Sequence, residues 1–266
     1  MDLGIAGKVA FVSGGSMGMG RATAELLAAE GCRVAVAALE QDKESIDDTV
    51  AAIKAAGGQA IGVAGDLTVK TDVQRAIAET TEAFGTPDIA IANVAGPGVG
   101  YLFDVADEDF MTAHQQMTMS MVYLCREVIP HMRAQKWGRI VNINSSSAKE
   151  PFRELAHILA NTGRAAVVAL NKSLSNEFAG DGVTINTIGT GYIGTDRMLG
   201  YFARVAAEKG LPVEAVQASL TASIPAGRVG LPSEMAGTIA FLCSEYGGFI
   251  NGELIAVDGG QHRSAW

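Results

Sequence analysis

Residues 9–20 read VAFVSGGSMGMG, and this stretch decides the fold of the 266-residue chain. A short apolar, β-branched run is followed by a glycine-rich turn and then by a segment of helical periodicity, Arg21–Glu30. Glycines at 14, 18 and 20 allow a tight turn, a close approach of backbone to a pyrophosphate, and packing of the helix on a sheet. The helix N-terminus would offer free N–H groups and a positive dipole end to phosphates. A tight strand–helix turn without a ligand needs similar glycines. The dinucleotide-binding interpretation therefore depends on the position of this motif at the first strand–helix junction.

Outward from this stretch, short apolar runs alternate with helical patterns along the whole chain. The predicted strands are Val9–Ser13, Arg33–Ala38, Ala60–Ala64, Ile89–Ala92, Arg139–Asn144, Thr184–Thr187 and Leu254–Val257. The segments with helical spacing include Arg21–Glu30, Lys43–Ala56 and Val73–Phe84. Continuously apolar strands that alternate with helices indicate a parallel sheet covered on both faces. We therefore predict an α/β fold: one Rossmann-type domain over residues 1–266, a doubly wound parallel sheet of about seven strands with helices on both faces.

One segment, Tyr192–Ser223, interrupts this alternation before the last helix and strand. In an open α/β sheet, ligands bind outside the carboxyl ends of the strands, and an insertion near that edge is well placed to cover them. We predict that residues 192–223 form a substrate lid.

Composition excludes several classes of function. The net charge is −9, so the chain has no electrostatic reason to bind nucleic acid or an anionic membrane surface. No apolar run has the length of a bilayer span, and Met1–Lys8 lacks the pattern of an export signal, which predicts a cytoplasmic protein. Cys32, Cys125 and Cys243 are scattered among apolar residues and predict small buried side chains in a reducing compartment. The four histidines have no metal-ligand spacing, so no metal is expected.

The pattern Gly14-x-x-x-Gly18-x-Gly20 resembles the glycine motif of the short-chain dehydrogenase/reductases. Further landmarks of that family follow in order, namely Asp66-Leu67, Asn93–Gly96, Gly138–Ile143, Asn186–Thr195, Arg228–Gly230 and Val257–Gly260. Two of them are altered, because Val94 replaces the second asparagine of N-N-A-G and Thr190 replaces a proline. The resemblance covers essentially the whole chain. It implies a dinucleotide site formed by Gly14, Ser16, Met17, Gly18, Met19, Gly20, Leu39, Asp66, Leu67, Asn93, Ala95, Gly96, Arg164, Gly191, Ile193 and Thr195.

The preferred dinucleotide depends on the end of the second strand. Family members that prefer NAD usually have an acidic residue there, and this chain has Ala38. The arginines typical of NADP-preferring members are absent as well, because the corresponding residues are Leu39 and Met17. Glu40 and Lys43 lie just beyond and could favour a free ribose or a phosphate, respectively, or could simply be solvated. The missing acid favours NADP over NAD by a small margin.

The family's catalytic set is incomplete in this chain. Aligning Arg164-Ala165-Ala166-Val167 with the family's K-A-A-V places Arg164 at the lysine position and Ala160 at the tyrosine position, and the asparagine position falls near Met117. Arginine can hold a ribose or a phosphate but does not release its proton at working pH. Both Ser145, which follows the fifth strand directly, and Ser147, which has the family's spacing to Ala160, are candidates for the catalytic serine. We favour Ser145.

Other side chains could replace the missing tyrosine. On a helix, His157, Ala160, Asn161 and Arg164 would share one stripe, and His157 is the one group of that stripe that titrates near neutral pH. It could equally cap or pack the helix start. Lys149 is a second candidate proton donor, or else a solvated loop residue. We also predict that Tyr192 and Asn161 contact substrate. The serine cluster, Lys149, Pro151, Asn161 and Arg164 resemble an atypical, ketoacyl-reductase-like branch of the family with an imperfect catalytic tetrad.

Three functions fit these residues. The favoured one is an NAD(P)(H)-dependent oxidoreductase that interconverts a carbonyl and a secondary alcohol of a small molecule. A redox-neutral isomerase, dehydratase or lyase on the same scaffold is the first alternative, and a catalytically silent dinucleotide-binding protein is the second. The retained glycine loop favours redox chemistry. The resemblance also implies a homodimer or homotetramer, with which the apolar segment Met117–Met132 and the tail Gln261–Trp266 are compatible.

Overall fold

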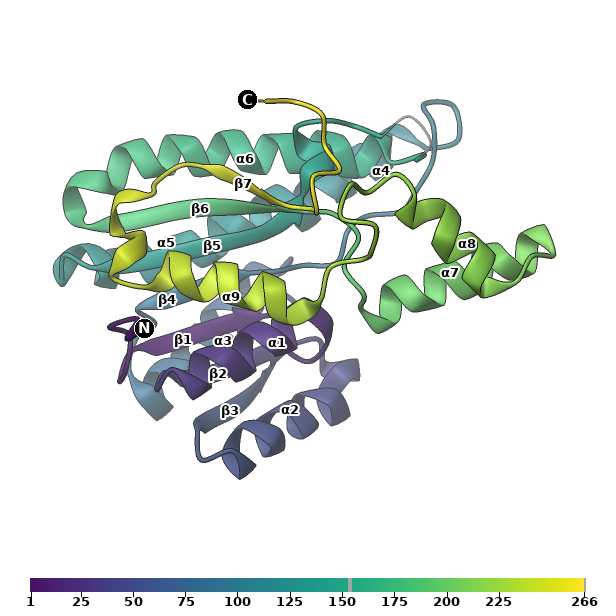
Figure 1. Cartoon of the computed structure of the whole chain (residues 1–266). Helices are drawn as coiled ribbons and strands as arrows, with labels where there is room; N and C mark the ends of the chain where they lie inside the picture. Colours follow the sequence, from purple (N-terminus) through teal and green to yellow (C-terminus); the bar gives the residue numbers. More distant parts are fainter. Residues whose placement is uncertain (153–154, 266) are drawn as a thin grey trace.

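A computed structural model describes residues 1–152 and 155–265 of the chain (Figure 1). Seven parallel strands form one sheet in the order β3-β2-β1-β4-β5-β6-β7. The strands are β1 (Val9–Ser13), β2 (Arg33–Ala38), β3 (Gln59–Ala64), β4 (Ile89–Ala92), β5 (Gly138–Ser145), β6 (Val183–Thr190) and β7 (Leu254–Val257). The order reverses between β1 and β4, which creates the switch point at which such sheets bind ligands. The doubly wound α/β fold that the sequence predicts is confirmed.

Helices cover both faces of the sheet (Figure 1). They are α1 (Gly18–Ala29), α2 (Lys43–Ala55), α3 (Lys70–Phe84), α4 (Asp107–His114), α5 (Ser120–Ala134), α6 (Ile158–Phe178), α7 (Asp196–Lys209), α8 (Val213–Thr221) and α9 (Pro232–Cys243). Short helical turns are η1 (Glu40–Asp42), η2 (Gln115–Met119), η3 (Ser146–Ala148), η4 (Ala179–Asp181) and η5 (Tyr246–Phe249).

Alternation along β1 shows how the core is divided. Ala10 and Val12 pack in the cluster that joins the sheet to α1, α2 and α9, whereas Phe11 packs in the cluster that joins it to α3, α5 and α6. All three side chains are fully buried. Successive strand residues point to opposite faces, so a strand buried on both sides has to be apolar throughout. This explains why the strand signal in the sequence was a continuous apolar run.

Four of the predicted strands match the structure in both boundaries, and three of the differences bear on the candidate site. The sixth strand continues to Thr190, because Gly189 and Thr190 remain paired with both β5 and β7. The apolar segment Met117–Met132 begins within a π-helical turn, η2, and continues into α5. His157 lies at the N-cap position of α6 and not inside the helix, with φ −111° and ψ 34°. The prediction that His157 belongs to a helical stripe with Arg164 is therefore wrong.

Residues 192–223, the segment proposed as a lid, contain the two helices α7 and α8. Figure 1 shows both helices projecting beyond the ends of the strands, away from the rest of the molecule. Phe202 and Ala206 are buried on α7 and Val216 on α8. The segment is therefore regular structure with its own packed face.

All three cysteines are buried, as predicted. Burial raises the pKa of the Cys32 and Cys125 thiols to about 12, so neither is a thiolate at neutral pH. In the part of the chain that the structure describes, no helix is both long and apolar enough to cross a membrane. Among the same residues, no group of three histidine, cysteine, aspartate or glutamate side chains could hold a metal ion.

Candidate functional site

Two adjoining cavities lie at the carboxyl edge of the sheet. The first, of about 340 Å³, is bounded by the glycine-rich turn and by residues that follow β2, β3 and β4. The second, of about 840 Å³, lies between the end of β5, the start of α6 and helix α7. Met19, Thr195 and Arg197 line both. A molecule in one cavity would therefore meet a molecule in the other at these three residues.

The glycine-rich turn has the geometry of a phosphate cradle. Gly14 and Gly18 have positive φ values of 57° and 56°, which side chains rarely adopt. A Cβ atom on Gly20 would overlap the carbonyl oxygen of Gly14, so α1 could not approach the turn with any larger residue there. Met17, at the N-cap of α1, provides no side-chain cap, and the first-turn N–H groups remain for a ligand. The turn fits the diphosphate of a dinucleotide.

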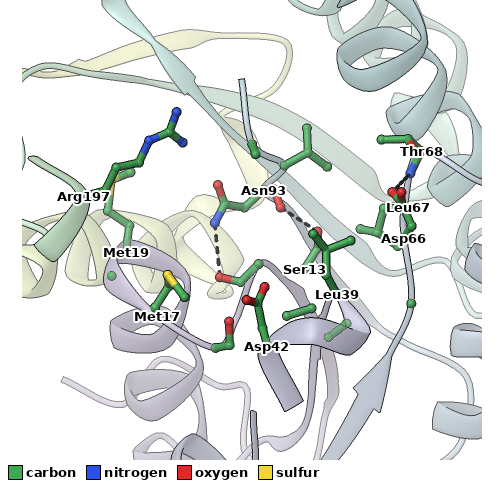
Figure 2. Close-up of a pocket in the computed structure, with 18 of the residues that line it drawn as sticks. Ser13, Met17, Met19, Leu39, Asp42, Asp66, Leu67, Thr68, Asn93 and Arg197 are labelled. Carbon is green, nitrogen blue, oxygen red and sulfur yellow. Dashed lines mark hydrogen bonds between the residues drawn. The ribbon is translucent and has the colours of Figure 1, made fainter. Parts of the chain in front are cut away.

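Most predicted dinucleotide-binding residues line this first cavity (Figure 2). They are Gly14, Ser16, Met17, Gly18, Met19, Leu39, Asp66, Leu67, Asn93, Ala95 and Thr195. The side chain of Asn93 joins the turn to the end of β4, because its Nδ2 donates to the carbonyl oxygen of Gly14 at 3.3 Å. Gly20 acts through packing, as described above, and Gly96 lies beside Arg164. Gly191, Ile193 and Arg164 line the second cavity instead.

The end of β2 shows a carboxylate that sequence reasoning missed. Asp42, in η1, lines the first cavity together with Ala38 and Leu39 (Figure 2). Lys43, the cation that could have favoured a phosphate, does not line the cavity, and its Nζ binds Asp47 Oδ2 at 2.8 Å. Among the described residues that line the first cavity, the one cation is Arg197, which lies where the two cavities meet.

Ser147 and Arg164 form the polar centre of the second cavity. Arg164 Nη1 donates a hydrogen bond of 2.9 Å to Ser147 Oγ, so the Ser147 hydroxyl proton is left to donate elsewhere. Burial, and then the charge of Arg197, lowers the pKa of Arg164 to about 10, and the guanidinium remains charged at neutral pH. A fixed positive charge next to a buried hydroxyl stabilises negative charge on an oxygen that this hydroxyl contacts.

Ser145 also lines the cavity, but its hydroxyl has structural partners. Its Oγ accepts from the Ser147 N–H at 3.2 Å and donates to the Thr190 carbonyl oxygen at 3.4 Å. These bonds cap the short turn η3 and tie β5 to β6. The hydrogen bonding thus favours Ser147 as the hydroxyl available to a ligand, in contrast to the preference for Ser145 drawn from the sequence.

His157 lines the second cavity even though it precedes α6. Its backbone carbonyl accepts from the Asn161 N–H at 2.8 Å, and its side chain makes no capping bond. Burial lowers the pKa of His157 below its usual 6.5, and the charges of Arg164 and Arg197 lower it further. The imidazole is therefore neutral at pH 7 and able to accept a proton.

The remaining predicted residues differ in their placement. Tyr192 lines the second cavity, where its ring stacks on Phe152 with centroids 6.5 Å apart. Lys149 is exposed and does not line either cavity. Asn161 does not line them either, and its buried Oδ1 has no hydrogen-bond partner among the described residues. Ala160, which the sequence analysis aligns with the family's tyrosine, is buried.

Helix α7 contributes cavity residues that the sequence analysis did not single out. Arg197, Tyr201 and Arg204 line the second cavity at positions i, i+4 and i+7, so they share one face of the helix. The Arg204 guanidinium lies 5.5 Å from the centre of the Tyr201 ring. This spacing was visible in the segment predicted to be a lid, but nothing in the sequence showed which face of the helix would meet the cavity.

Comparisons with known proteins agree with this geometry. A family profile described as "Enoyl-(Acyl carrier protein) reductase" matches residues 14–262. Short-chain reductase protein NovJ of Streptomyces niveus is 32% identical over 254 residues, which is 95% of this chain and 93% of that protein. The 3-oxoacyl-[acyl-carrier-protein] reductase FabG of Vibrio cholerae is 32% identical over 261 residues, covering 98% and 99%.

A solved structure is similar over nearly its full length. L-Sorbose reductase from Gluconobacter frateurii, in complex with NADPH and L-sorbose, superposes with a TM-score of 0.94 at 28% identity, covering 99% of this chain and 100% of that one. The chain belongs to the short-chain dehydrogenase/reductase family. It is an NAD(P)-dependent oxidoreductase of that family, whose substrates are carbonyl or alcohol compounds.

Proposed function

We propose that this protein interconverts a ketone and a secondary alcohol with a catalytic set in which Ser147 serves as the family's serine, Arg164 takes the place of the lysine and His157 takes the place of the tyrosine. The observation that carries the proposal is the hydrogen bond from Arg164 to Ser147 inside a cavity that adjoins the glycine-rich turn. Two of these residues, Ser147 and Arg164, belong to the pattern that resembles the atypical, imperfect-tetrad branch of the family.

The first cavity would hold the dinucleotide. The turn from Gly14 to Gly20 and the N-terminus of α1 would bind the diphosphate, Asp66 and Leu67 would contact the adenine, and Thr195 would contact the nicotinamide end. When bound, the nicotinamide accepts the hydride that leaves the substrate carbon in alcohol oxidation, and supplies that hydride in ketone reduction. The side chains of the second cavity orient the substrate and handle its proton.

In alcohol oxidation, two bonds of the substrate break. The carbinol C–H bond gives up its hydrogen as a hydride, and the O–H bond gives up a proton, which an imidazole nitrogen of His157 accepts. The C=O double bond forms with the electron pair of the O–H bond. Ser147 donates a hydrogen bond to the reacting oxygen, and the Arg164 charge behind it stabilises negative charge there. Ketone reduction is the reverse, with the proton returning from His157.

The cofactor preference remains a prediction with arguments on both sides. The alanine at position 38 and the NADPH complex of the similar sorbose reductase support NADP(H). Asp42 works in the opposite direction, because a carboxylate beside the adenosine ribose repels a 2′-phosphate and can accept a hydrogen bond from a free 2′-hydroxyl. We propose NADP(H), with Asp42 limiting the margin over NAD(H).

The segment 192–223 would act as a substrate lid in this proposal. Support comes from α7, which presents Arg197, Tyr201 and Arg204 to the second cavity, and from Tyr192 at the start of the segment. Assembly into a homodimer or homotetramer stays a prediction from the family resemblance. Of the tail Gln261–Trp266, the last residue lies outside the described part of the chain.

Calorimetric titration of cofactor-free protein with NADPH and then NADH tests the proposal. We expect micromolar binding of at least one, with NADPH the tighter, followed by cofactor oxidation at 340 nm in a screen of ketones. If neither dinucleotide binds, the oxidoreductase proposal is wrong, and a redox-neutral reaction on this scaffold becomes the leading hypothesis.

A further inference from the structure

The charge of the second cavity is opposite to that of the chain. The protein carries a net charge of −9, yet the described residues that line this cavity include Arg164, Arg197 and Arg204 and one carboxylate, Glu208. Glu208 lies 3.9 Å from Arg204 and offsets that one charge. Arg164 and Arg197 form no ion pair with any residue that the structure describes. Among the residues that the structure describes, the lining of this cavity therefore carries more positive than negative charge.

The arginines act on each other and on His157. The charge of Arg197 helps to lower the pKa of Arg164, and both charges help to lower the pKa of His157. Arg164 is partly buried, whereas Arg197 and Arg204 are exposed where they line the cavity. Like charges at this range repel one another, and a ligand of opposite charge offsets that repulsion. Here the described lining leaves that role to a molecule that binds in the cavity.

Helix α7 orients two of these cations. The Thr195 hydroxyl caps the helix by accepting from the Met198 N–H at 3.4 Å, which fixes the first turn that carries Arg197. Arg204 follows two turns later on the same face. Figure 2 draws Arg197 on the Met19 side of the first cavity, away from Asp66 and Leu67, where the two cavities meet. Arg197 is therefore placed to reach a substrate next to the nicotinamide end of a dinucleotide.

We propose that the substrate of this enzyme carries an oxyanion, a carboxylate or a phosphate, in addition to its reacting carbonyl or alcohol, and that Arg197 and Arg204 bind that group. Guanidinium groups bind both kinds of oxyanion through paired hydrogen bonds. The cavity volume of about 840 Å³ accommodates such a small molecule with Ser147 and His157 at its inner end. This inference rests on the proposed oxidoreductase function.

Two matched pairs of probes test it on the whole protein loaded with the oxidised cofactor, in which a ketone cannot be reduced. One pair is 4-oxopentanoate and its methyl ester, and the other is dihydroxyacetone phosphate and dihydroxyacetone. We expect calorimetry to show about tenfold or tighter binding of the charged member in at least one pair, with a ratio that falls as salt is added. The pair that shows the effect identifies the oxyanion as a carboxylate or a phosphate.

Charge variants separate this site from the cofactor site. Arg197→Gln and Arg204→Gln should each reduce the charged-to-neutral ratio several-fold. The cofactor Kd should stay within about twofold in Arg204→Gln, because Arg204 lines the second cavity and not the first. Arg126→Gln, which removes an exposed charge that lines neither cavity, should change neither quantity. Equal binding of the charged and neutral members, or no binding of either charged probe, overturns the oxyanion inference and leaves the proposed oxidoreductase function standing. The same conclusion follows if the arginine variants bind the cofactor more weakly but keep the charged-to-neutral ratio of the wild-type protein.

A wild-type protein that binds no dinucleotide fails at an earlier step. That result overturns the proposed function together with the inference that rests on it. The cofactor titration therefore comes first, and its outcome distinguishes the two failures.

Discussion

The two cavities at the carboxyl edge of the sheet depend on different parts of the chain. The first is formed largely by backbone, from a turn whose glycines have no room for side chains and from loops that directly follow strands. The second is formed by side chains from β5, α6 and α7, segments that lie up to 63 residues apart between Ser145 and Glu208. A cavity formed by backbone atoms can be recognised from its glycine motif even where neighbouring residues differ. The chemistry of a cavity formed by side chains changes with each substitution. Arg164, which the sequence analysis places at the family's lysine position, lies in the second cavity.

Changing the backbone cavity should have the largest effect. Gly20→Ala places a Cβ against the carbonyl oxygen of Gly14, and the turn has to move away from α1. We expect loss of measurable dinucleotide binding and a decrease of about 3 kcal/mol in the free energy of unfolding. Calorimetry and chemical denaturation measure the two effects. Gly237→Ala in α9, where a Cβ meets nothing within 4 Å, is the matched control and should bind cofactor normally. Normal binding by the Gly20 variant would show that the turn is less constrained than the structure indicates.

Removing the central hydroxyl of the side-chain cavity should have the next largest effect. Ser147→Ala takes away the group that Arg164 orients, and we expect kcat to fall roughly 100- to 1,000-fold while the cofactor Kd is unchanged. Ser145→Ala loses hydrogen bonds within η3 and should reduce kcat much less. Steady-state kinetics of both variants with one ketone decides between them. A larger loss from the Ser145 variant would restore the preference that the sequence suggested.

The third prediction concerns the pH dependence of His157. Because the pKa of His157 is lowered below 6.5, its basic form persists in mildly acidic solution, and alcohol oxidation should decline only as the pH falls through that lowered value. His157→Gln should lower the oxidation rate by about 100-fold and abolish this decline. Rates measured from pH 4.5 to 8.5 test both statements, and an unchanged pH profile in the variant would remove His157 from the mechanism.

The same shift has a consequence for stability. A histidine whose pKa is lower in the folded protein than in the unfolded chain binds its proton more readily after unfolding. The free energy of unfolding therefore falls as the pH drops below about 6.5, and stops falling from this cause below the lowered value. Denaturation curves should show a smaller loss between pH 7.5 and 5 in His157→Gln than in the wild-type protein.

The smallest expected effect concerns the Asp42 side chain, which lines the first cavity. Asp42→Asn removes a carboxylate from the end that would hold the adenosine ribose. We expect the NADPH Kd to fall a few-fold and the NADH Kd to stay constant or rise slightly, because one exposed-edge charge contributes about 1 kcal/mol. Parallel titrations measure the ratio. An equal change for both dinucleotides would place Asp42 away from the 2′ position.

The agreement between sequence and structure follows the same division. Four of the strands, among them β1 and β7, match the predicted boundaries, and the glycine turn lies where the motif placed it. These features depend on local patterns, namely apolar runs and the steric limits of glycine. The start of α6 was predicted less well, because whether residue 157 joins the helix depends on contacts of its loop, including the bridge between Gly100 and His157.

The sequence by itself determined the α/β fold and the position of the dinucleotide turn, because each is a property of residue types at fixed spacing along the chain. Only the tertiary structure decided that Ser147 and not Ser145 receives the hydrogen bond of Arg164, that Asp42 enters the first cavity, and that α7 turns Arg197 and Arg204 toward the second. These arrangements arise where segments distant in sequence meet. Their side-chain directions are set by packing across the sheet edge, which no local pattern records.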